Sequence, residues 1–365
     1  MRPSWVEVDL RAVAHNVATL ARIAHPAPVC AVVKADGYGH GDVPVAETAL
    51  GAGAACLAVA LVEEGIRLRE AGIEAPILLL SEPSPAAAGE LVEWRLTPTA
   101  YRAAFLDALE AAAPHPIDVH LKVDTGMHRV GAPPDTVVDL ARQVVGSSHL
   151  RMAGLWSHLA VAEEDADFTA HQVRLFEESV AGVRAAGAEI PTRHLANTAG
   201  SILHPTARLD MVRTGIGVYG LHPCEATRSV ADLRPAMRVV SHVAYLRRHP
   251  GGSRPSYGRR RALPREMTVA TIPVGYADGV PRLLSDRGGE VLIRSRRYPL
   301  AGTVTMDQIM VEVGDDPLEV GDEVVLIGRQ GDEEVGADEW ASRMETINYE
   351  IVCQIGPRLP RRYRR

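Results

Sequence analysis

The sequence predicts an α/β protein in which an N-terminal (β/α)8 barrel, similar to a TIM barrel, is followed by a mainly β C-terminal domain. Short apolar runs alternate with amphipathic helical segments over roughly the first 220 residues, a length and rhythm that match a barrel better than an open sheet. From about residue 236 the pattern changes to β-rich segments with glycine and aspartate turns, which is typical of a separate β domain.

The elements of the barrel follow one another in a regular order. A first helix is expected over residues 10–24, since its apolar residues share one helical face and Asp9 can cap its N-terminus. Strands are then expected at 28–34, 56–60, 77–80, a weak run near Leu96, 117–123, 152–158, 192–195 and 209–212. Helices are expected between several of them, at 61–72, 100–112, 134–145 and 167–187.

The second domain is expected to consist of strands joined by short turns. Its strands are predicted at 267–273, 290–293, 300–305, 309–313 and 323–327, with one helix at 337–344. We expect the barrel domain to occupy residues 1–230 and the β-rich domain residues 231–365. Whether residues 1–10 pair with the second domain is left open.

Composition and charge exclude several classes of protein. The chain of 365 residues carries a net charge of −7, which argues against nucleic acid as a partner, and its 46% hydrophobic content allows a sizeable core. No apolar run approaches the roughly 20 residues that cross a bilayer, and the start MRPSWVEVDL lacks a secretory pattern, so we expect a cytoplasmic protein without membrane contact. The cysteines form no Cys-x-x-Cys pair and the histidines no His-Glu-x-x-His motif, so no metal site is expected.

Polar side chains close several of the predicted barrel strands. In barrels of this kind the reacting groups lie at the C-terminal ends of the strands, so these side chains should face one mouth. They are Lys34, Lys122 leading to Arg129, His158, Asn197 with Thr198, and Arg213. Chance would spread such groups over both ends, so the pattern indicates a site.

Lysine is rare in this chain and both lysines lie at predicted strand ends. Of the 39 basic residues only Lys34 and Lys122 are lysines, and lysine, unlike arginine, can lose its proton and form an imine. Lys34 opens the segment AVVKADGYGHG, whose glycines allow a sharp turn and a close approach of the backbone to a ligand. A surface lysine beside a turn is the alternative, but the barrel position favours an imine-forming lysine.

The segments after the last two strands could bind phosphate. Asn197 and Thr198 begin a helical stretch after the seventh strand, and Gly215 and Ile216 follow the eighth, which are the positions where such barrels hold phosphate. An ordinary helix cap is the alternative for Asn197. Together with an imine-forming lysine, a phosphate site indicates pyridoxal phosphate as the cofactor.

Arg213 would then lie near the cofactor ring. A guanidinium donates hydrogen bonds but cannot accept one, so contact with the pyridine nitrogen would keep that nitrogen unprotonated and make the ring a weaker electron sink. Such a site suits a single proton removal with quick return. A structural salt bridge is the alternative role of Arg213.

Segments spread over nearly the whole chain resemble the alanine racemase family. Besides AVVKADGYGHG, which is similar to that family's cofactor signature, they are LKVDTGMHRVG at 121–131, SHLA at 157–160, HLANTAG at 194–200, VRTGIGVYG at 212–220, SYG at 256–258, GYADG at 275–279, TMDQ at 305–308 and TINYEI at 346–351. The resemblance implies that the protein interconverts L- and D-alanine and supplies D-alanine for peptidoglycan.

The resemblance also implies two bases and a shared active site. Lys34 would hold pyridoxal phosphate as a Schiff base and act on one face of the substrate Cα, and Tyr257 would act on the other face. In the family this tyrosine is supplied by the second subunit of a head-to-tail homodimer. The cofactor would be surrounded by Tyr38, His158, Asn197, Thr198, Arg213, Gly215, Ile216 and Tyr349.

For the substrate, the resemblance implies binding through its carboxylate. Arg129 and the backbone N–H of Met306, the latter again from the second subunit, would bind that carboxylate, while Tyr276 and Asp307 would shape the entrance. Lys122 matches a lysine that in some members is carbamylated and orients the arginine at the position of Arg129.

Some residues depart from the common pattern of the family and leave alternatives open. Thr305 stands where many members have cysteine, and His128 interrupts the segment before Arg129, so a broader amino-acid racemase, acting for example on serine, is one alternative. A decarboxylase of the same barrel type would lack the pairing of Tyr257 with the segment GYADG. A cofactor-binding protein with a lone barrel would lack the second domain.

Overall fold

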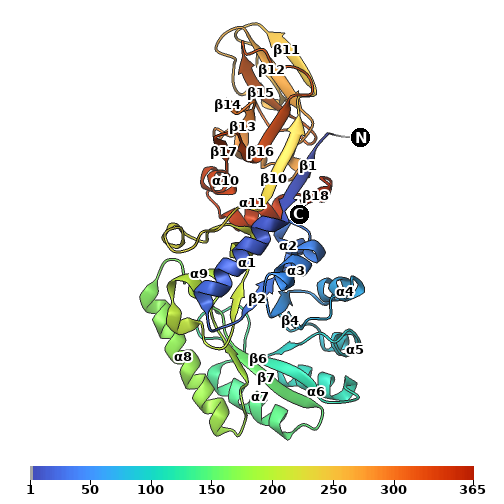
Figure 1. Ribbon diagram of the computed structural model, residues 1–365, viewed down its shortest axis with the longest axis vertical. Helices are drawn as coiled ribbons and strands as arrows, with labels where there is room; N and C mark the ends of the chain where they lie inside the picture. The colour runs from blue at the N-terminus through green and yellow to red at the C-terminus, as the bar shows by residue number, and fades with distance from the viewer. Residues whose placement is uncertain (1–2) are drawn as a thin grey trace. The chain divides into compact units, whose positions relative to one another are not determined.

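The computed structural model describes residues 3–365 (Figure 1). Its internal contacts divide the chain into two compact units, which we call the barrel unit and the β unit. The barrel unit comprises residues 12–37 and 41–234, and the β unit comprises residues 3–11, 38–40 and 235–365. Within the described residues, no helix is long and apolar enough to cross a membrane.

The barrel unit contains two four-stranded parallel sheets that join into one ring, which confirms the predicted (β/α)8 fold. Its strands are β2 (Val29–Val32), β3 (Cys56–Val59), β4 (Ile77–Leu79), β5 (Thr99–Ala100), β6 (Ile117–Lys122), β7 (Leu150–Trp156), β8 (Thr192–His194) and β9 (Val212–Thr214). The sheets run in the orders β4-β3-β2-β9 and β5-β6-β7-β8. A parallel bridge between Leu78 and Thr97 joins them on one side, and the Arg213 N–H donates to the Ala196 carbonyl at 3.0 Å on the other.

Two barrel strands lie a few residues later than predicted. The weak run near Leu96 contributes a bridge at Thr97, and the strand itself starts at Thr99. The run at 209–212 becomes a strand only from Val212, because Leu209 has a φ of 49° and turns the chain. Both differences are local, since the order of the strands is the predicted one.

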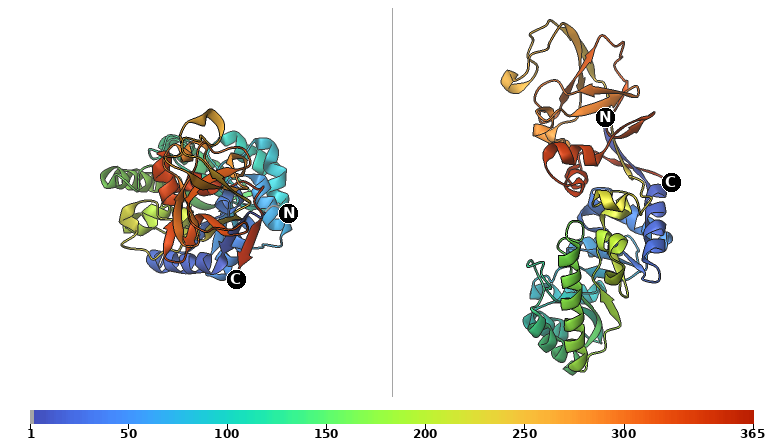
Figure 2. Two further views of the ribbon diagram at one scale, coloured as in Figure 1. Left: turned by 90° about the horizontal axis from the view of Figure 1, so that it is seen from above. Right: turned by 90° about the vertical axis from the view of Figure 1, so that its left-hand side faces the viewer.

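Helices cover the outside of the barrel. They are α1 (Leu10–Ala24), α3 (Asp42–Gly51), α4 (Val62–Glu70), α5 (Ala88–Glu93), α6 (Ala103–Ala112), α7 (Pro134–Gly146), α8 (Ala166–Ala185) and α9 (Thr198–Leu203). The predicted helices are confirmed, whereas α3 and α5 were not predicted. The Asp9 carboxylate accepts the Arg11 N–H at 2.9 Å, as expected of a cap at the start of α1. Helix α7 packs on β6 and β7, and the long α8, green in Figure 2, packs on α7.

The β unit contains two sheets and two short helices. The larger sheet has the order β14 (Arg296–Pro299), β13 (Glu290–Ile293), β16 (Glu323–Gln330), β10 (Met237–His242), β1 (Trp5–Asp9) and β18 (Arg361–Arg364), with β17 (Glu333–Val335) paired to β16. The smaller sheet has the order β11 (Tyr245–His249), β12 (Met267–Ile272) and β15 (Ile309–Gly314). The helices are α10 (Ala337–Met344), which matches its prediction, and α11 (Asn348–Gln354), which was not predicted.

The prediction of a strand at 300–305 is wrong. The chain makes strand β14 earlier, up to Pro299, and Leu300 keeps only an isolated bridge to Val311. Proline has no N–H to donate to a ladder, and beyond it the Ala301 N–H makes a single bond to β15, with the Met310 carbonyl at 2.7 Å, before the chain continues as a loop. The Thr305 carbonyl accepts the Tyr276 N–H at 3.0 Å, so this segment supports a turn of the candidate site.

Candidate active site

A left-handed turn follows Lys34 at the end of β2. Ala35, Asp36 and Gly37 have φ values of 53°, 53° and 57°, a conformation that costs a non-glycine residue roughly 1–2 kcal/mol. The predicted sharp turn is therefore present, but it involves three non-glycine residues as well as glycine, since Tyr38 also has a positive φ of 52°. Strain of this kind persists only where the surroundings hold it, and it is concentrated at functional sites.

Glu64 on α4 is the group that holds this turn. Its Oε1 accepts the Ala35 N–H at 2.7 Å, and its Oε2 accepts the N–H groups of Ala60 and Leu61 at 2.8 and 3.1 Å. The carboxylate is buried, so these three bonds tie the start of α4 to the turn after the lysine. Sequence reasoning missed Glu64; its position near the start of a helix directly after a strand was the available signal.

A second carboxylate supports the far side of the turn. The Asp36 side chain accepts the Asp42 N–H at 3.2 Å, and Asp42 in turn accepts a hydrogen bond from Arg67 Nε at 2.6 Å. This bond with Asp42 is the main reason why the pKa of Arg67 is raised. The segment around Lys34 is thus fixed by contacts to α3 and α4.

Arg213 lies buried in the barrel with only neutral acceptors around it. Its guanidinium donates to the Ser157 and Leu195 carbonyls at 2.8 and 3.2 Å, to His194 Nδ1 at 2.9 Å and to His158 Nδ1 at 3.2 Å. Among residues 3–365 it forms no ion pair with a carboxylate, so the salt-bridge alternative is wrong. Burial lowers the pKa of Arg213 to about 10, and the group is still a cation at neutral pH.

Lys122 shares the aromatic surface of Trp156 with Arg213. The Lys122 Nζ lies 4.0 Å from the centre of the Trp156 ring, and the Arg213 Cζ lies 4.4 Å from it. Burial and then the charges of Arg213 and Arg129 lower the pKa of Lys122 to about 7. A large part of this amine is therefore neutral at physiological pH.

Cations predominate at this end of the barrel. The pKa of His158 is well below its usual value, first because the ring is buried and then because Arg213, Lys122, Arg129 and Lys34 all act on it. The same field acts on Lys122. The structure thus brings together the predicted strand-end residues, and together they form an electropositive site suited to an anionic ligand.

Arg129 differs from these buried groups because it is exposed. Within the described residues its guanidinium makes no hydrogen bond or ion pair, whereas its neighbour Asp124 is occupied by the N–H groups of Gly126 and His128 at 2.9 and 3.1 Å. A guanidinium in this state can bind a carboxylate or phosphate in a bidentate manner.

The segments after β8 and β9 meet at Thr198. The Thr198 Oγ1 accepts the N–H groups of Gly215 and Gly217 at 3.1 and 3.4 Å, and Gly215 precedes Ile216 at the start of a short 3-10 helix. A Cβ at Gly217 would lie 2.7 Å from the Thr198 methyl group, so glycine is required there. Asn197 caps α9 by accepting the Gly200 N–H at 2.8 Å, which confirms the ordinary helix cap, while a phosphate-binding role of Asn197 stays a prediction.

In the β unit, three loops carry the predicted residues Tyr257, Tyr276 and Met306. The Thr303 hydroxyl donates to the Tyr257 carbonyl at 2.9 Å, and the Ala277 N–H donates to the Met306 carbonyl at 3.1 Å. The side chains themselves are exposed, with 71% of Tyr257, 41% of Tyr276 and 52% of Met306 accessible. Arg358 donates to Asp307 at 2.7 Å and fixes the end of the same loop.

Tyr38 and Tyr349 also lie together in the β unit. Their ring centres are 6.3 Å apart, and the Gly39 carbonyl beside Tyr38 accepts a hydrogen bond from Arg361 Nε at 3.0 Å. A Cβ at Gly39, which has a φ of 78°, would overlap the Val352 carbonyl of α11. The tyrosine pair is therefore set by close packing of residues 38–40 on α11.

An electropositive barrel mouth with a lysine on a constrained turn, joined in one chain to a β unit, defines a class of barrel enzymes that act on anionic ligands. Domain models of one family match both units: the alanine racemase N-terminal domain at residues 8–223 and the alanine racemase C-terminal domain at residues 236–363. The chain belongs to the alanine racemase family, and it is an isomerase. Because the C-terminal domain is matched, the lone-barrel alternative is wrong.

Individual relatives are similar over their whole length. The chain is 47% identical to the alanine racemase of Symbiobacterium thermophilum, covering 100% of this chain and 97% of the relative, and 42% identical to that of Nostoc, covering 98% and 95%. Among solved structures, alanine racemase from Bacillus anthracis with bound L-Ala-P has a TM-score of 0.94 at 35% identity, covering 100% and 96% of the two chains. Histidine racemase from Leuconostoc mesenteroides has a TM-score of 0.91 at 26% identity, covering 100% and 98%.

Proposed function

We propose that this isomerase is a pyridoxal-phosphate-dependent racemase that interconverts L- and D-alanine, using Lys34 and Tyr257 as its two bases. The observation that carries the proposal is the concentration of cations around His158 beside a lysine on a strained turn. The similarity to alanine racemases over the full chain supports alanine as the substrate.

The residues of the barrel unit fit this cofactor. A phosphate dianion needs cations, which the barrel mouth supplies, and the ring nitrogen is an acceptor that a buried guanidinium can meet. Bound pyridoxal phosphate supplies an aldehyde for imine formation and a conjugated ring that accepts electron density from the substrate Cα. Asn197, Thr198, Gly215 and Ile216, with Tyr38 and Tyr349, would hold the phosphate.

Arg213 and His158 would contact the ring of the cofactor. Arg213 has no carboxylate partner, so its charge is available to a ligand, and as a donor it leaves the ring nitrogen unprotonated. His158 is neutral at physiological pH because its pKa is well below the usual value, and it can pack on the ring without adding charge.

Two bases on opposite faces follow from the chemistry of racemisation. A proton must leave one face of the substrate Cα and another must arrive on the opposite face, so one group acts as the base and a second group acts as the acid. Lys34 Nζ would serve one face and Tyr257 Oη the other. Tyr257 is 71% exposed within its own chain, which fits a residue that completes the site of a second subunit in a homodimer.

The substrate carboxylate would be bound by two groups that have no partner in the described chain. These are the exposed guanidinium of Arg129 and the backbone N–H of Met306, for which no hydrogen bond occurs among residues 3–365. Lys122 would orient Arg129 after carbamylation, a reaction that needs the neutral amine that its lowered pKa provides. Tyr276 and Asp307 would shape the entrance, and the D-alanine formed in the cytoplasm would supply peptidoglycan.

A broader amino-acid racemase is the second candidate, because histidine racemase is among the structural neighbours. The two departures of this sequence give that candidate little support. Thr305 is occupied in its own turn, where its hydroxyl donates to the Gln308 carbonyl at 2.8 Å. The His128 side chain is 84% exposed and lies 3.4 Å from Asp124.

The test measures exchange of the α-hydrogen in heavy water for each alanine enantiomer. Wild type should exchange both, Lys34→Ala should lose imine formation, and Tyr257→Phe should lose exchange from one enantiomer more than from the other. Tyr245→Phe is the matched control, since Tyr245 is 55% exposed on β11 of the same unit. Undiminished racemisation by Tyr257→Phe would overturn the two-base assignment, and equal activity on serine or histidine would favour the second candidate.

A further inference from the structure

Behind Arg213 lies a chain of two histidines that the proposed reaction does not use. Arg213 Nη1 lies 2.9 Å from His194 Nδ1, and His194 Nε2 lies 2.8 Å from His120 Nδ1. His194 is fully buried and His120 is 8% exposed, so bulk water does not compete for these bonds. The side chains come from three strands of the barrel, β9, β8 and β6.

The direction of every bond in this chain is fixed. A guanidinium only donates, so His194 Nδ1 must accept from Arg213. Burial lowers the pKa of His120 to about 4 and that of His194 well below its usual value, so each ring is neutral and carries one N–H. His194 therefore has its proton on Nε2 and donates it to His120 Nδ1, which must be unprotonated.

The barrel is shaped to admit the His120 ring. Strand β7 bulges beside β6, because Val119 pairs with Met152 and His120 pairs with Gly154, which leaves Ala153 without a partner. A Cβ at position 154 would overlap His120 Nδ1 and the Thr192 carbonyl. Bulges re-aim side chains next to active sites, and the lack of a side chain at Gly154, beside this bulge, leaves the space that the His120 ring fills.

Two further contacts hold the middle of the chain. The His194 ring stacks on Trp156, with ring centres 5.5 Å apart and planes at 12°, and Trp156 Nε1 donates to the Thr99 hydroxyl at 3.1 Å. Stacking fixes the plane of the imidazole but allows a 180° flip about its Cβ–Cγ bond, which would exchange the nitrogen and carbon edges of the ring. The hydrogen bonds to Arg213 and His120 together select one of these two orientations.

We propose that His120 is a positioning residue: by accepting the His194 Nε2 proton it locks the imidazole that aims Arg213 toward the cofactor ring. This role rests on the proposed function, because it assumes that Arg213 meets that ring. Without the acceptor, a buried N–H would have no partner and the His194 ring would rotate to find one, which would move the group on which Arg213 is held.

The first experiment reads the hydrogen positions without any assay of activity. Long-range 1H–15N spectra of the full-length protein labelled with 15N-histidine should show His194 protonated at Nε2 and unprotonated at Nδ1, and His120 unprotonated at Nδ1. The reverse tautomer of either ring would overturn the proposal. This result is independent of whether the protein racemises alanine, so failure of the proposed function remains distinguishable.

The second experiment separates the acceptor from the bulk of the ring. His120→Leu removes the acceptor and should lower kcat roughly tenfold, with KM within about twofold, since one buried hydrogen bond is at stake. His120→Asn, whose carbonyl can accept the same proton, should stay within about threefold of wild type and keep the wild-type tautomer of His194. His115→Leu, at an exposed histidine of the barrel unit, is the matched control.

The outcomes decide the proposal in each case. A wild-type kcat in His120→Leu would overturn the proposal. A loss of kcat in His120→Asn as large as that in His120→Leu would also overturn it, because the volume of the imidazole and not its acceptor nitrogen would then explain the loss. If His120→Leu does not fold, the spectra and the kcat of His120→Asn decide on their own.

Discussion

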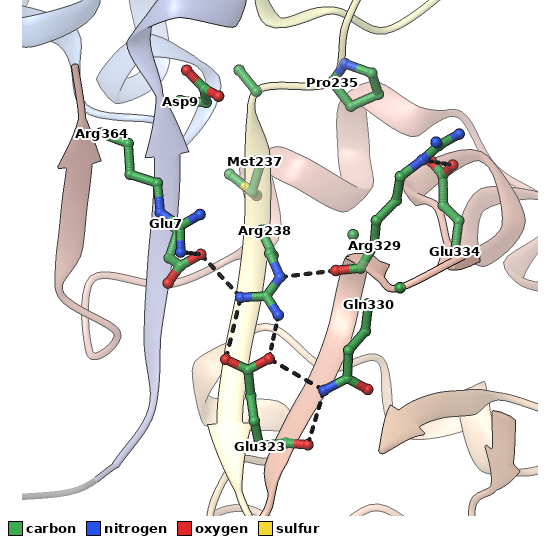
Figure 3. A pocket seen from close by; sticks show the side chains of 13 residues that line it. Glu7, Asp9, Pro235, Met237, Arg238, Glu323, Arg329, Gln330, Glu334 and Arg364 are labelled. Atoms are coloured by element: carbon green, nitrogen blue, oxygen red, sulfur yellow. Dashed lines mark hydrogen bonds and ion pairs between the residues drawn. The ribbon is translucent and has the colours of Figure 1, made fainter. Parts of the chain in front are cut away.

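Arg213 in the barrel unit and Arg238 in the β unit are both largely shielded from water, but their partners are of opposite kinds. Arg213 donates only to carbonyl oxygens and neutral imidazoles. Arg238 bonds to the carboxylates of Glu7, at 3.0 Å, and Glu323 (Figure 3). Burial lowers the pKa of Arg213 to about 10, whereas burial of Arg238 is outweighed by its bonds to Glu323 and Glu7, so its pKa is raised.

The surroundings of Arg238 show that a hollow of suitable size is not enough for a ligand site. The pocket it lines has a volume of about 630 Å³, but its arginines already have carboxylate partners. Arg364 pairs with Glu7 at 2.6 Å and Arg329 with Glu334 at 2.7 Å. A buried cation is available to a ligand where the protein surrounds it with neutral acceptors. A cation that is paired with carboxylates stabilises the fold instead.

The largest effect is expected from replacing Lys34, the lysine of the barrel mouth, with arginine, which cannot lose its proton. Lys34→Arg should lower activity on the order of 1000-fold or more, because a guanidinium forms no imine with the cofactor. Borohydride reduction followed by peptide mass analysis should find no cofactor adduct. Lys122→Arg should still yield the adduct at Lys34, and an adduct at full yield in Lys34→Arg would contradict the assignment.

Exchange of the two compared arginines for an apolar residue should affect different properties. Arg213→Met should lower kcat for alanine racemisation by roughly 100-fold, because a preorganised donor is lost. Arg238→Met should leave kcat within about twofold but lower the free energy of unfolding by roughly 2 kcal/mol, since Glu7 loses a hydrogen-bonded partner and keeps Arg364. Steady-state kinetics and urea unfolding of both variants measure these effects, and equal kcat values would refute the contrast.

An intermediate effect is expected from replacing Glu64, the carboxylate of the barrel unit that accepts hydrogen bonds from backbone N–H groups. Glu64→Gln leaves one acceptor oxygen for the N–H groups of Ala35, Ala60 and Leu61, so it should lower stability by about 1–2 kcal/mol and weaken cofactor binding. Urea unfolding and titration of the cofactor-free protein test both effects. Glu63→Gln on the exposed face of the same helix is the control. Identical stability and cofactor affinity in the two variants would contradict the role of Glu64 in holding the turn after Lys34.

The smallest effect is expected from the carboxylate partner of Arg238. Burial alone would raise the pKa of Glu7, but hydrogen bonds from Arg238 and Trp5 and the charge of Arg364 lower it below 4.5. A lowered pKa stabilises the fold above pH 4.5 and loses this effect as the pH falls through the folded-state value. Glu7→Gln should therefore be less stable by about 1 kcal/mol at pH 7 and approach wild type as the pH falls through the folded-state pKa of Glu7, as measured by urea unfolding over the acid range.

Much of the barrel could be predicted because its signals are local. Apolar runs marked most of the strands, and the positions at which these runs end pointed to Lys34, Lys122, His158 and Arg213, since parallel strands in a barrel all end at one mouth. The predicted strand at 300–305 failed because apolar content alone cannot show that Pro299 ends a ladder and that the next residues support a loop. The site roles themselves stay predictions.

What the sequence did not reveal depends on contacts between distant segments. Glu64 acts on Ala35 from a helix one strand further along, and no local pattern links the two. His120 and His194 lie 74 residues apart and meet only inside the closed barrel. Their donor directions follow from Arg213, whose neutral surroundings cannot be read from residues beside it in the chain.

The strained turn after Lys34 makes the position of this lysine depend on neighbouring elements of the barrel unit. Ala35 and Asp36 are unfavourable in their left-handed conformation until Glu64 accepts the Ala35 N–H, and Glu64 is in place only after β2 has paired with β3 and α4 has begun. The proposed imine-forming lysine would therefore be held in place only in molecules in which the β2–β3 pair and the start of α4 have both formed.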